Sequence, residues 1–259
     1  MSLAAILVGG AVAAFFALRR GAHEVSLNDA RRRFEQNSST LPQQAHVLRP
    51  RAGVYAYVGS GNEHLSFPPK DQKQGPRMPG TVTHHANGCW TLRIDYSSNH
   101  WQTFDYCPRG QGLAETGGKT FERFDFVATK VDTIATITCK PEAPIVLAGL
   151  HAGQVWQQRC TGTNSAISGS LTTAGPYTFI GEESVDVGGS AVPAYHFRQE
   201  RTLTGAQTGN QRVDFWFATD TGMPLRNERK YTVHSDSPIG TVTFTETGEF
   251  HLTSLTPQT

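Results

Sequence analysis

Two cysteines that bracket a hairpin pattern constrain the fold of this chain more than any other feature. Cys89 and Cys107 enclose the runs CWTLRIDY and HWQTFDYC, in which apolar and polar residues alternate on either side of a Ser-Ser-Asn turn. A turn centred on Ser98 places Cys89 directly opposite Cys107, and it also places Tyr96 opposite His100. Opposed cysteines in an antiparallel pair lie close enough to bond, so the spacing predicts a disulfide-linked β-hairpin.

A second pair of cysteines, Cys139 and Cys160, surrounds the loop-like stretch EAPIVLAGLHAG. The chain has no C-x-x-C spacing, which is typical of zinc sites and of redox centres. Four cysteines permit three pairings, and the sequence favours two local bridges, each closing a loop of about twenty residues and contributing roughly 3 kcal/mol. Because cytosolic thiols stay reduced, two disulfides predict an extracytoplasmic domain.

Turn-forming residues recur along residues 52–259 and separate short runs in which apolar and polar residues alternate. With 26 glycines and 14 prolines among 259 residues, this pattern is typical of an all-β fold, and an antiparallel meander is the simplest topology. One interval differs, because PPKDQKQGPRMPG at residues 68–80 is rich in proline and charge and predicts a long loop. We therefore expect one antiparallel β domain over residues 52–259.

The N-terminal residues 3–18, LAAILVGGAVAAFFAL, are all apolar or small, and two arginines follow them. At about 1.5 Å per residue, a helix of this length falls slightly short of a bilayer core of roughly 30 Å, but tilt and local thinning cover the difference. We expect residues 1–20 to form a transmembrane or signal-anchor segment. No basic residue precedes the run, which conflicts with the positive-inside rule for an external β domain, so charge alone leaves orientation and cleavage open.

Residues 21–51 are expected to form a basic juxtamembrane helix and a linker. In VSLNDARRRFEQ, Ser26 is placed to cap a helix whose apolar residues recur at helical spacing, and a polar, proline-marked stretch follows. Seven arginines against three acidic residues in segment 19–51 favour contact with anionic lipid headgroups, although a solvated helix face accounts for them equally well. The arginines are Arg19, Arg20, Arg31, Arg32, Arg33, Arg49 and Arg51.

The overall charge limits the kinds of partner. A formal net charge of +1 provides no broad positive field for nucleic acid, so no nucleic-acid partner is expected. The apolar run and the cysteine pairs instead predict a single-pass protein of the cell membrane with an extracytoplasmic β domain. Membrane lipid would be contacted through residues 3–18 and the basic residues of segment 19–51.

Sequence motifs for catalysis and metal binding are missing. The chain has no G-x-S-x-G, P-loop, Rossmann fingerprint, H-E-x-x-H or EF-hand pattern. His84 and His85, joined by His64 or His100, form the most suggestive metal candidate. Adjacent strand residues face opposite sides, however, so ordinary turn histidines are favoured, and we predict neither a metal nor another cofactor.

Carboxylate pairs are the remaining candidates for acid–base chemistry. Glu182 with Glu183, and Asp214 with Asp220, are close in sequence, but Glu182 and Glu183 alternate across a strand and suit solvated positions. No catalytic residue is therefore predicted.

Aromatic residues supply the candidates for ligand contacts. Tryptophan and phenylalanine side chains would line a cavity for an apolar ligand, although such residues also build ordinary cores. In RVDFWFAT, successive residues face opposite sides of the strand, so Trp216 lies on the face opposite to that of Phe215. The candidate ligand-binding residues are Trp90, Trp101, Trp156, Trp216 and Phe215.

A resemblance to a known family rests on residues 179–229, FIGEESVDVGGSAVPAYHFRQERTLTGAQTGNQRVDFWFATDTGMPLRNER. A strand with G-x-E-x-V and the aromatic passage FWFATDTGMPLRNER resemble the C-terminal half of LolA/LppX/LprG-type lipoprotein carriers of bacterial envelopes. The whole chain also resembles an uncharacterised actinobacterial membrane-anchored envelope protein. The carrier resemblance implies a half-open barrel or curved sheet with an apolar, lipid-binding cavity, and it assigns no site residue. This chain differs from the carriers in its two cysteine pairs and in lacking a lipobox.

Three functions are compatible with these features. The leading expectation is a non-enzymatic, membrane-anchored domain that binds a lipid or another apolar ligand. The alternative is a structural or interaction subunit of a cell-envelope complex that uses segment 68–80 or exposed strands. A hydrolase of unfamiliar type is the third.

Overall fold

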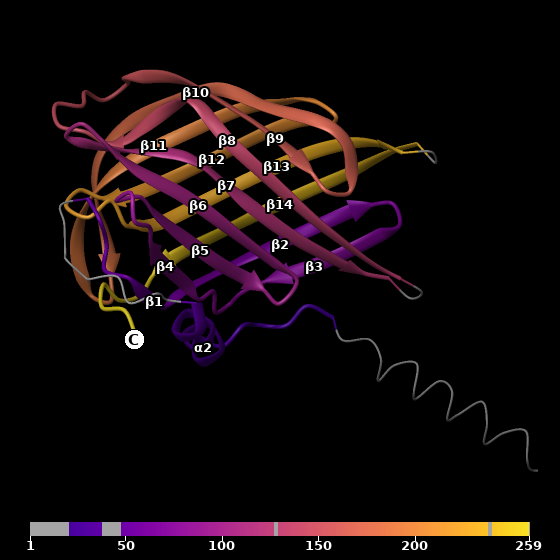
Figure 1. The fold of residues 1–259 in the computed structure, drawn as a ribbon, viewed down its shortest axis with the longest axis horizontal. Coiled ribbons are helices and arrows are strands. Elements are labelled where there is room, and N and C mark those ends of the chain that lie inside the picture. Colours follow the sequence, from indigo (N-terminus) through magenta and orange to yellow (C-terminus); the bar gives the residue numbers. More distant parts are fainter. Residues whose placement is uncertain (1–20, 38–47, 127–128, 238–239, 259) are drawn as a thin grey trace, which may run out of the picture.

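The computed structural model describes residues 21–37, 48–126, 129–237 and 240–258. Over these residues the chain forms one α-helix and a single fourteen-stranded antiparallel sheet (Figure 1). No helix in the described part of the chain is long and apolar enough to span a bilayer. The predicted membrane segment, residues 3–18, lies outside the described residues, as does most of the predicted linker.

The helix α2 spans Leu27–Asn37 and confirms the helix expected in this segment. The Ser26 hydroxyl accepts a hydrogen bond from the backbone N–H of Asp29 at 3.1 Å, which caps the first turn. Ala30 is buried, and α2 packs against β1 and β4. Arg33 holds the helix to the sheet through an ion pair of 2.6 Å with the buried carboxylate of Asp95. The position of α2 next to a membrane stays a prediction.

The strands are β1 (Gly53–Tyr55), β2 (Tyr57–Ser66), β3 (Pro69–Gln74), β4 (Gly80–His84), β5 (Trp90–Ser97), β6 (His100–Arg109), β7 (Gly112–Asp125), β8 (Lys130–Val146), β9 (Val155–Asn164), β10 (Ile167–Val187), β11 (Ser190–Gly205), β12 (Thr208–Ala218), β13 (Pro224–Ser237) and β14 (Gly240–Leu252).

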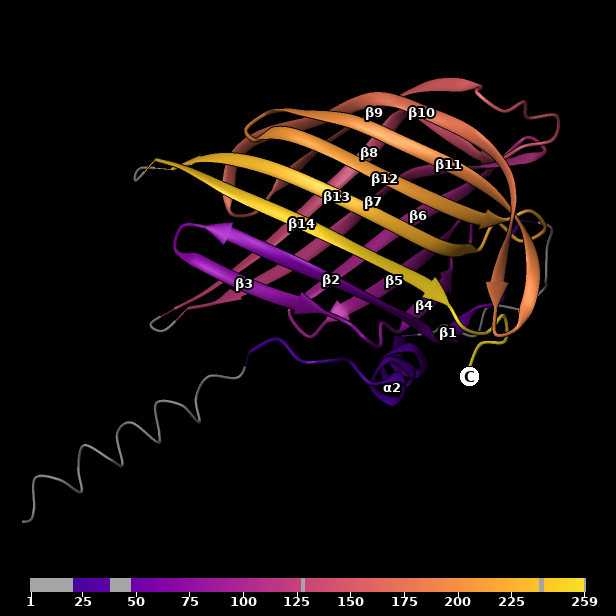
Figure 2. The same ribbon diagram turned by 180° about the vertical axis from the view of Figure 1, so that it is seen from behind.

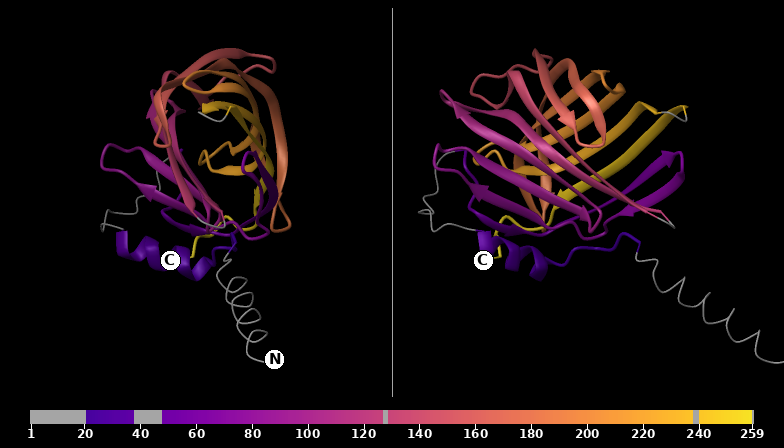
Figure 3. Two further views of the ribbon diagram at one scale, coloured as in Figure 1. Left: turned by 90° about the vertical axis from the view of Figure 1, so that its right-hand side faces the viewer. Right: turned by 45° about the vertical axis from the view of Figure 1, so that its right-hand side comes forward.

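Strands β4 to β14 form a meander in which each strand pairs antiparallel with the next. The first strands complete it at both ends, because β1 pairs with β4 while β2 pairs with β14 and carries β3 at the edge. Only Ala56 separates β1 from β2, so one extended segment joins the two ends of the meander. The sheet curls until the wall β5–β8 faces the wall β11–β14 (Figures 1, 2 and 3). The expected all-β, antiparallel half-barrel is thereby confirmed.

The prediction of a loop over residues 68–80 is wrong for the first half of this segment, because β3 forms there. Gln72 and Gln74 are buried and alternate with the exposed Asp71 and Lys73. This is a strand period, but its inward-facing members are polar, so a search for alternating apolar residues does not detect it.

Both predicted disulfides are present, Cys89–Cys107 and Cys139–Cys160. The predicted register of the first hairpin holds from the cysteines as far as Asp95, and then it shifts. His100 lies opposite Ser97 rather than Tyr96, because the Ser97 hydroxyl accepts hydrogen bonds from the two following turn amides at 3.1 Å each and tightens the turn. His100 faces inward because it shares the alternation of the buried Phe104 and Tyr106 along β6.

The apolar core fills the end of the barrel near β1. Eight of its largest fully buried side chains are aromatic, and they pack in edge-to-face and tilted contacts. The buried hydroxyl of Tyr57 donates to the Pro224 carbonyl oxygen at 2.7 Å, which ties the closing segment to the opposite wall. The eight residues are Tyr57, Trp90, Tyr96, Tyr106, Tyr177, Phe197, Phe217 and Phe250.

Candidate functional site

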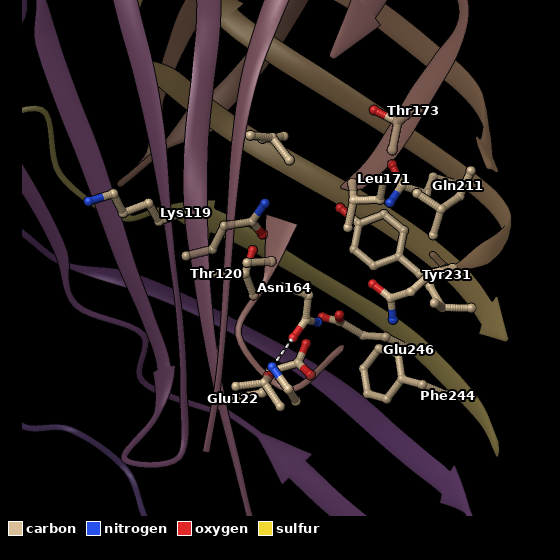
Figure 4. Close-up of a pocket in the computed structure, with 18 of the residues that line it drawn as sticks. Lys119, Thr120, Glu122, Asn164, Leu171, Thr173, Gln211, Tyr231, Phe244 and Glu246 are labelled. Atoms are coloured by element: carbon tan, nitrogen blue, oxygen red, sulfur yellow. Dashed lines mark hydrogen bonds between the residues drawn. The ribbon is translucent and has the colours of Figure 1, made fainter. Parts of the chain in front are cut away.

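A cavity of about 350 Å³ occupies the other end of the barrel, between the two walls. Its lining includes residues of five hairpin turns or their flanks: β2–β3, β7–β8, β9–β10, β11–β12 and β13–β14. These turns lie at one end of the molecule, so this end is the mouth. Figure 4 shows Thr120 and Glu122 of β7 on one side and Leu171, Tyr231 and Phe244 on the other, while Lys119 extends away from them.

The outer part of the cavity is apolar. Aliphatic and aromatic side chains from β2, β7, β8, β10, β11, β13 and β14 line it, and at the rim the side chains of Phe67 and Val131 are 52% and 39% exposed. Exposed apolar residues grouped at a cavity mouth indicate a binding surface. The apolar lining residues include Leu65, Phe67, Phe124, Phe126, Val131, Ala135, Ile137, Ile167, Leu171, Leu203, Val233 and Phe244.

The inner part of the cavity is polar, and one side of it centres on Arg201 of β11. Its guanidinium donates to the side-chain oxygens of Gln158 and Gln199 at 3.0 and 2.8 Å. Both glutamines donate in turn to Glu115, at 3.4 and 2.6 Å. All four residues are buried, and the two amides separate the guanidinium from the carboxylate.

A second polar cluster centres on Glu246 of β14, which also lines the cavity. Arg229 donates to Glu246 at 2.6 Å, and the Gln74 amide donates to Glu246 and Glu63 at 2.9 and 2.6 Å. The Nδ1 atom of His100 lies 2.5 Å from Glu63 Oε1. Two buried carboxylates therefore share one guanidinium and one imidazole.

The charges in this second cluster balance because its ionisable groups shift one another's pKa values. Burial lowers the pKa of His100, but the charges of Glu63 and Glu246 outweigh it and raise the pKa to about 9. Burial raises the pKa of Glu122 to about 8, against the opposing effect of the His100 charge. Burial thus favours the protonated form of Glu122, whose carboxyl group provides both a donor and an acceptor at the cavity wall.

The same cluster contains a set of possible metal ligands. Ligand atoms of Glu63, His100 and Glu246 lie within 4.8 Å of one another. The amide nitrogen of Gln74 is 2.6, 2.9 and 3.1 Å from Glu63 Oε1, Glu246 Oε1 and His100 Nδ1, so it occupies the position that a cation would need. With Arg229 beside it, the cluster forms a hydrogen-bonded ion network, in which His100 Nε2 alone has no hydrogen-bond partner among the described residues and lies 3.8 Å from Glu122.

The cluster depends on two strand glycines. A Cβ atom at Gly61 would lie 2.2 Å from Gln74 Oε1, and one at Gly248 would lie 2.7 Å from Arg229 Nη2. The side chains of Gln74 and Arg229 thus lie directly against the backbone of Gly61 and Gly248. Glycines inside strands, next to charged residues at the same alternation, are the sequence signal that could have located this cluster.

Of the predicted ligand-binding residues, Phe215 lines the cavity and the four tryptophans do not. Trp90 is in the core and donates to the Leu48 carbonyl oxygen, and Trp156 packs on Phe197. Trp101 stacks on Phe121 outside the cavity. Trp216 stacks on His196, with ring centroids 4.1 Å apart. Ligand contact stays a prediction, and this placement favours Phe215.

The histidines considered as metal ligands lie in different parts of the described structure. His84 lies 2.8 Å from the Pro50 carbonyl oxygen, and His85 lies 2.8 Å from the Thr91 hydroxyl. His64 pairs with Asp71 at an exposed edge. Only His100 enters the cluster with Glu63 and Glu246.

Of the carboxylates considered for acid–base chemistry, one member of each candidate pair contacts the same histidine. Glu183 and Asp214 flank the ring of His196, at 2.7 and 2.9 Å from its two nitrogens. Asp214 also binds Arg198, while Asp220 bonds to its neighbour Thr221. No hydroxyl or thiol in the described part of the chain bonds to His196, so the group is an ion-pair ladder on the outer face.

No protein-family model and no curated protein matches the chain. Among solved structures, the crystal structure of the hypothetical lipoprotein YmcC from Escherichia coli K12 is similar, with a TM-score of 0.36 and 11% identity. The match covers 78% of this chain and 86% of that chain. Similarity of this size transfers no residue role to this protein.

Proposed function

We propose that this protein binds a lipid or another apolar ligand in the cavity at the open end of its half-barrel. The observation that carries the proposal is the cavity itself, with apolar walls, an exposed aromatic residue at its rim and a polar inner end. Its volume lies at the lower end of the range of small-molecule sites, about 300–1,000 Å³, which favours a ligand with one chain.

The proposed location is the cell envelope, with the β domain outside the cytoplasm and residues 3–18 as the anchor. The two disulfides support this location, because such bonds persist in oxidising compartments. Surface labelling of intact cells tests it, and a β domain labelled only after lysis would refute it.

Binding of the neutral fluorescent probe N-phenyl-1-naphthylamine to delipidated protein tests the cavity. Ala135 faces the cavity, whereas its neighbour Ile134 is exposed on the other side of β8. We expect Ala135→Trp to fill the cavity and weaken probe binding about tenfold, and Ile134→Trp to leave it unchanged. Equal probe binding by both variants would refute the proposal.

A second candidate is an interaction subunit of an envelope complex, and the edge strand β3 favours it. No strand in the described part of the chain pairs with the outer side of β3. Pro69, Lys70 and Lys73 limit strand addition there, because proline and lysine protect exposed edges, so β3 supports this candidate less strongly than the cavity supports ligand binding. Affinity capture from native membranes with a Gln72→Pro control tests this role. Loss of a stable partner in the control would support it, and the absence of any partner would refute it.

A further inference from the structure

The inner end of the cavity contains a buried arginine whose partners are all neutral. Arg201 is only 8% exposed, and its Nη atoms contact the side-chain oxygens of Gln158 and Gln199 and, at 3.4 Å, the sulfur of Cys160. No carboxylate among the described residues forms an ion pair with it. A buried guanidinium normally has a direct anionic partner, so this arrangement leaves a place for one.

Two hydrogen-bond donors at this place have no partner. Arg201 Nε and Thr173 Oγ1 are both buried, and neither forms a hydrogen bond with any described residue. Thr173 lies directly opposite Cys160 on the neighbouring strand, and Arg201 contacts that same cysteine, so the two donors belong to one corner of the cavity. Figure 4 places Thr173 beside Leu171 on the cavity wall.

The missing partner must accept hydrogen bonds. The Nε–H of arginine is only a donor, and the glutamine oxygens nearby are already used by its Nη groups. Gln158 and Gln199 also stand between the guanidinium and Glu115, so that carboxylate does not neutralise Arg201 directly. A carboxylate oxygen suits this corner best, because it adds opposite charge to the hydrogen bond.

We propose that the ligand is a single-chain amphiphile that enters carboxylate first, with its carboxylate bound by Arg201 and Thr173. Its chain then runs past Leu171 and Leu203 toward the apolar mouth. This inference rests on the proposed function and specifies its ligand class. It requires a small movement of the Thr173 and Arg201 side chains, because both donor atoms are covered in the structure.

Calorimetric titration of the delipidated full chain with dodecanoate and with dodecan-1-ol, below their micelle concentrations, tests the proposal. We expect dodecanoate to bind at least about tenfold more tightly than the alcohol. Arg201→Gln is expected to remove this preference and Thr173→Val to reduce it. Arg198→Gln, on the outer face of the same strand, is expected to keep the preference.

The outcomes separate this inference from the proposed function. Equal affinity of the wild type for acid and alcohol, with probe binding intact, would overturn the carboxylate site and leave the cavity function standing. An acid preference that survives both Arg201→Gln and Thr173→Val would likewise overturn it. Absence of binding by the probe and by both amphiphiles would overturn the proposed function. If Arg201→Gln does not fold, Thr173→Val decides, since an unchanged acid preference in that variant contradicts the site.

Discussion

His100 Nδ1 lies 2.5 Å from Glu63 Oε1, and both side chains are 1% exposed. The pair joins the turn of the predicted hairpin to β2, a strand that pairs with the far end of the sheet. Burial of a charged imidazole is tolerated here because Glu63 and Glu246 both face it, so the stability of the half-barrel depends on the protonation of His100.

Stability is expected to fall as the pH rises from neutral to about 9. The pKa of His100 is raised to about 9 from 6.5, so its contribution is complete below pH 6.5 and is lost as the pH rises through 9. The pKa of Glu122 is raised to about 8 from 4.5, so its contribution is also greatest at low pH and is lost by pH 8. Urea unfolding between pH 6 and 10 measures the slope.

Glu122→Gln is the control for this titration, because a neutral amide removes the Glu122 part of the slope and keeps most of that of His100, whose pKa is raised more by Glu63 and Glu246 than by Glu122. His100→Gln is expected to flatten the remainder. A free energy of unfolding that stays constant or increases between pH 6.5 and 9 would contradict the assigned charges.

The ion pair between Arg229 and Glu246 yields a second prediction. Arg229→Met leaves a buried carboxylate without its guanidinium, which is expected to cost about 3–5 kcal/mol of unfolding free energy. The double variant with Glu246→Met is expected to regain part of this loss, because both charges are then absent. Arg226→Met serves as the control, since its exposed pair with Glu228 contributes about 1 kcal/mol or less. Additive losses in the double variant would show that the pair is not coupled.

Local patterns predicted much of the fold. The alternation and the cysteine spacing fixed the all-β class, both disulfides and most of one hairpin register, and Ser26 marked the start of the helix. These features depend on residues near one another in the sequence. The pairing of β2 with β14 joins residues almost two hundred positions apart, and no local pattern encodes it.

The polar inner end of the cavity was not predicted, and the reason is a different one. Charged residues in strands usually face solvent, as predicted for Glu182 and Glu183, whereas Glu63, Arg201 and Glu246 face inward. Their partners come from strands distant in sequence, so a single strand shows only a charge at an inward position. The four tryptophans, in contrast, were predicted to contact a ligand, and they lie outside the cavity lining.

Gly61→Ala is expected to lower the unfolding free energy by about 1–3 kcal/mol. The new methyl group would lie 2.2 Å from Gln74 Oε1 and 2.9 Å from the backbone oxygen of Thr247. Gln74 has little freedom to move, because Glu63 and Glu246 both hold its amide. Gly21→Ala, which meets nothing within 4 Å, is the control. Urea denaturation of the two variants measures the difference, and equal stabilities would show that the Gln74 side chain adapts freely.

The two disulfides are expected to contribute similarly to stability but differently to binding. Replacing either pair by alanines should cost about 3 kcal/mol, because each bridge closes a loop of similar length, with sequence separations of 18 and 21. Only Cys160 contacts Arg201, through a sulfur atom that accepts weakly. The variant lacking Cys139 and Cys160 should therefore also bind dodecanoate with affinity altered by roughly threefold, less than 1 kcal/mol. The variant lacking Cys89 and Cys107 should bind it as the wild type does. Urea denaturation and calorimetric titration of both folded variants give these two quantities, and identical binding changes in both would indicate a general loosening of the barrel rather than a local contact with the arginine.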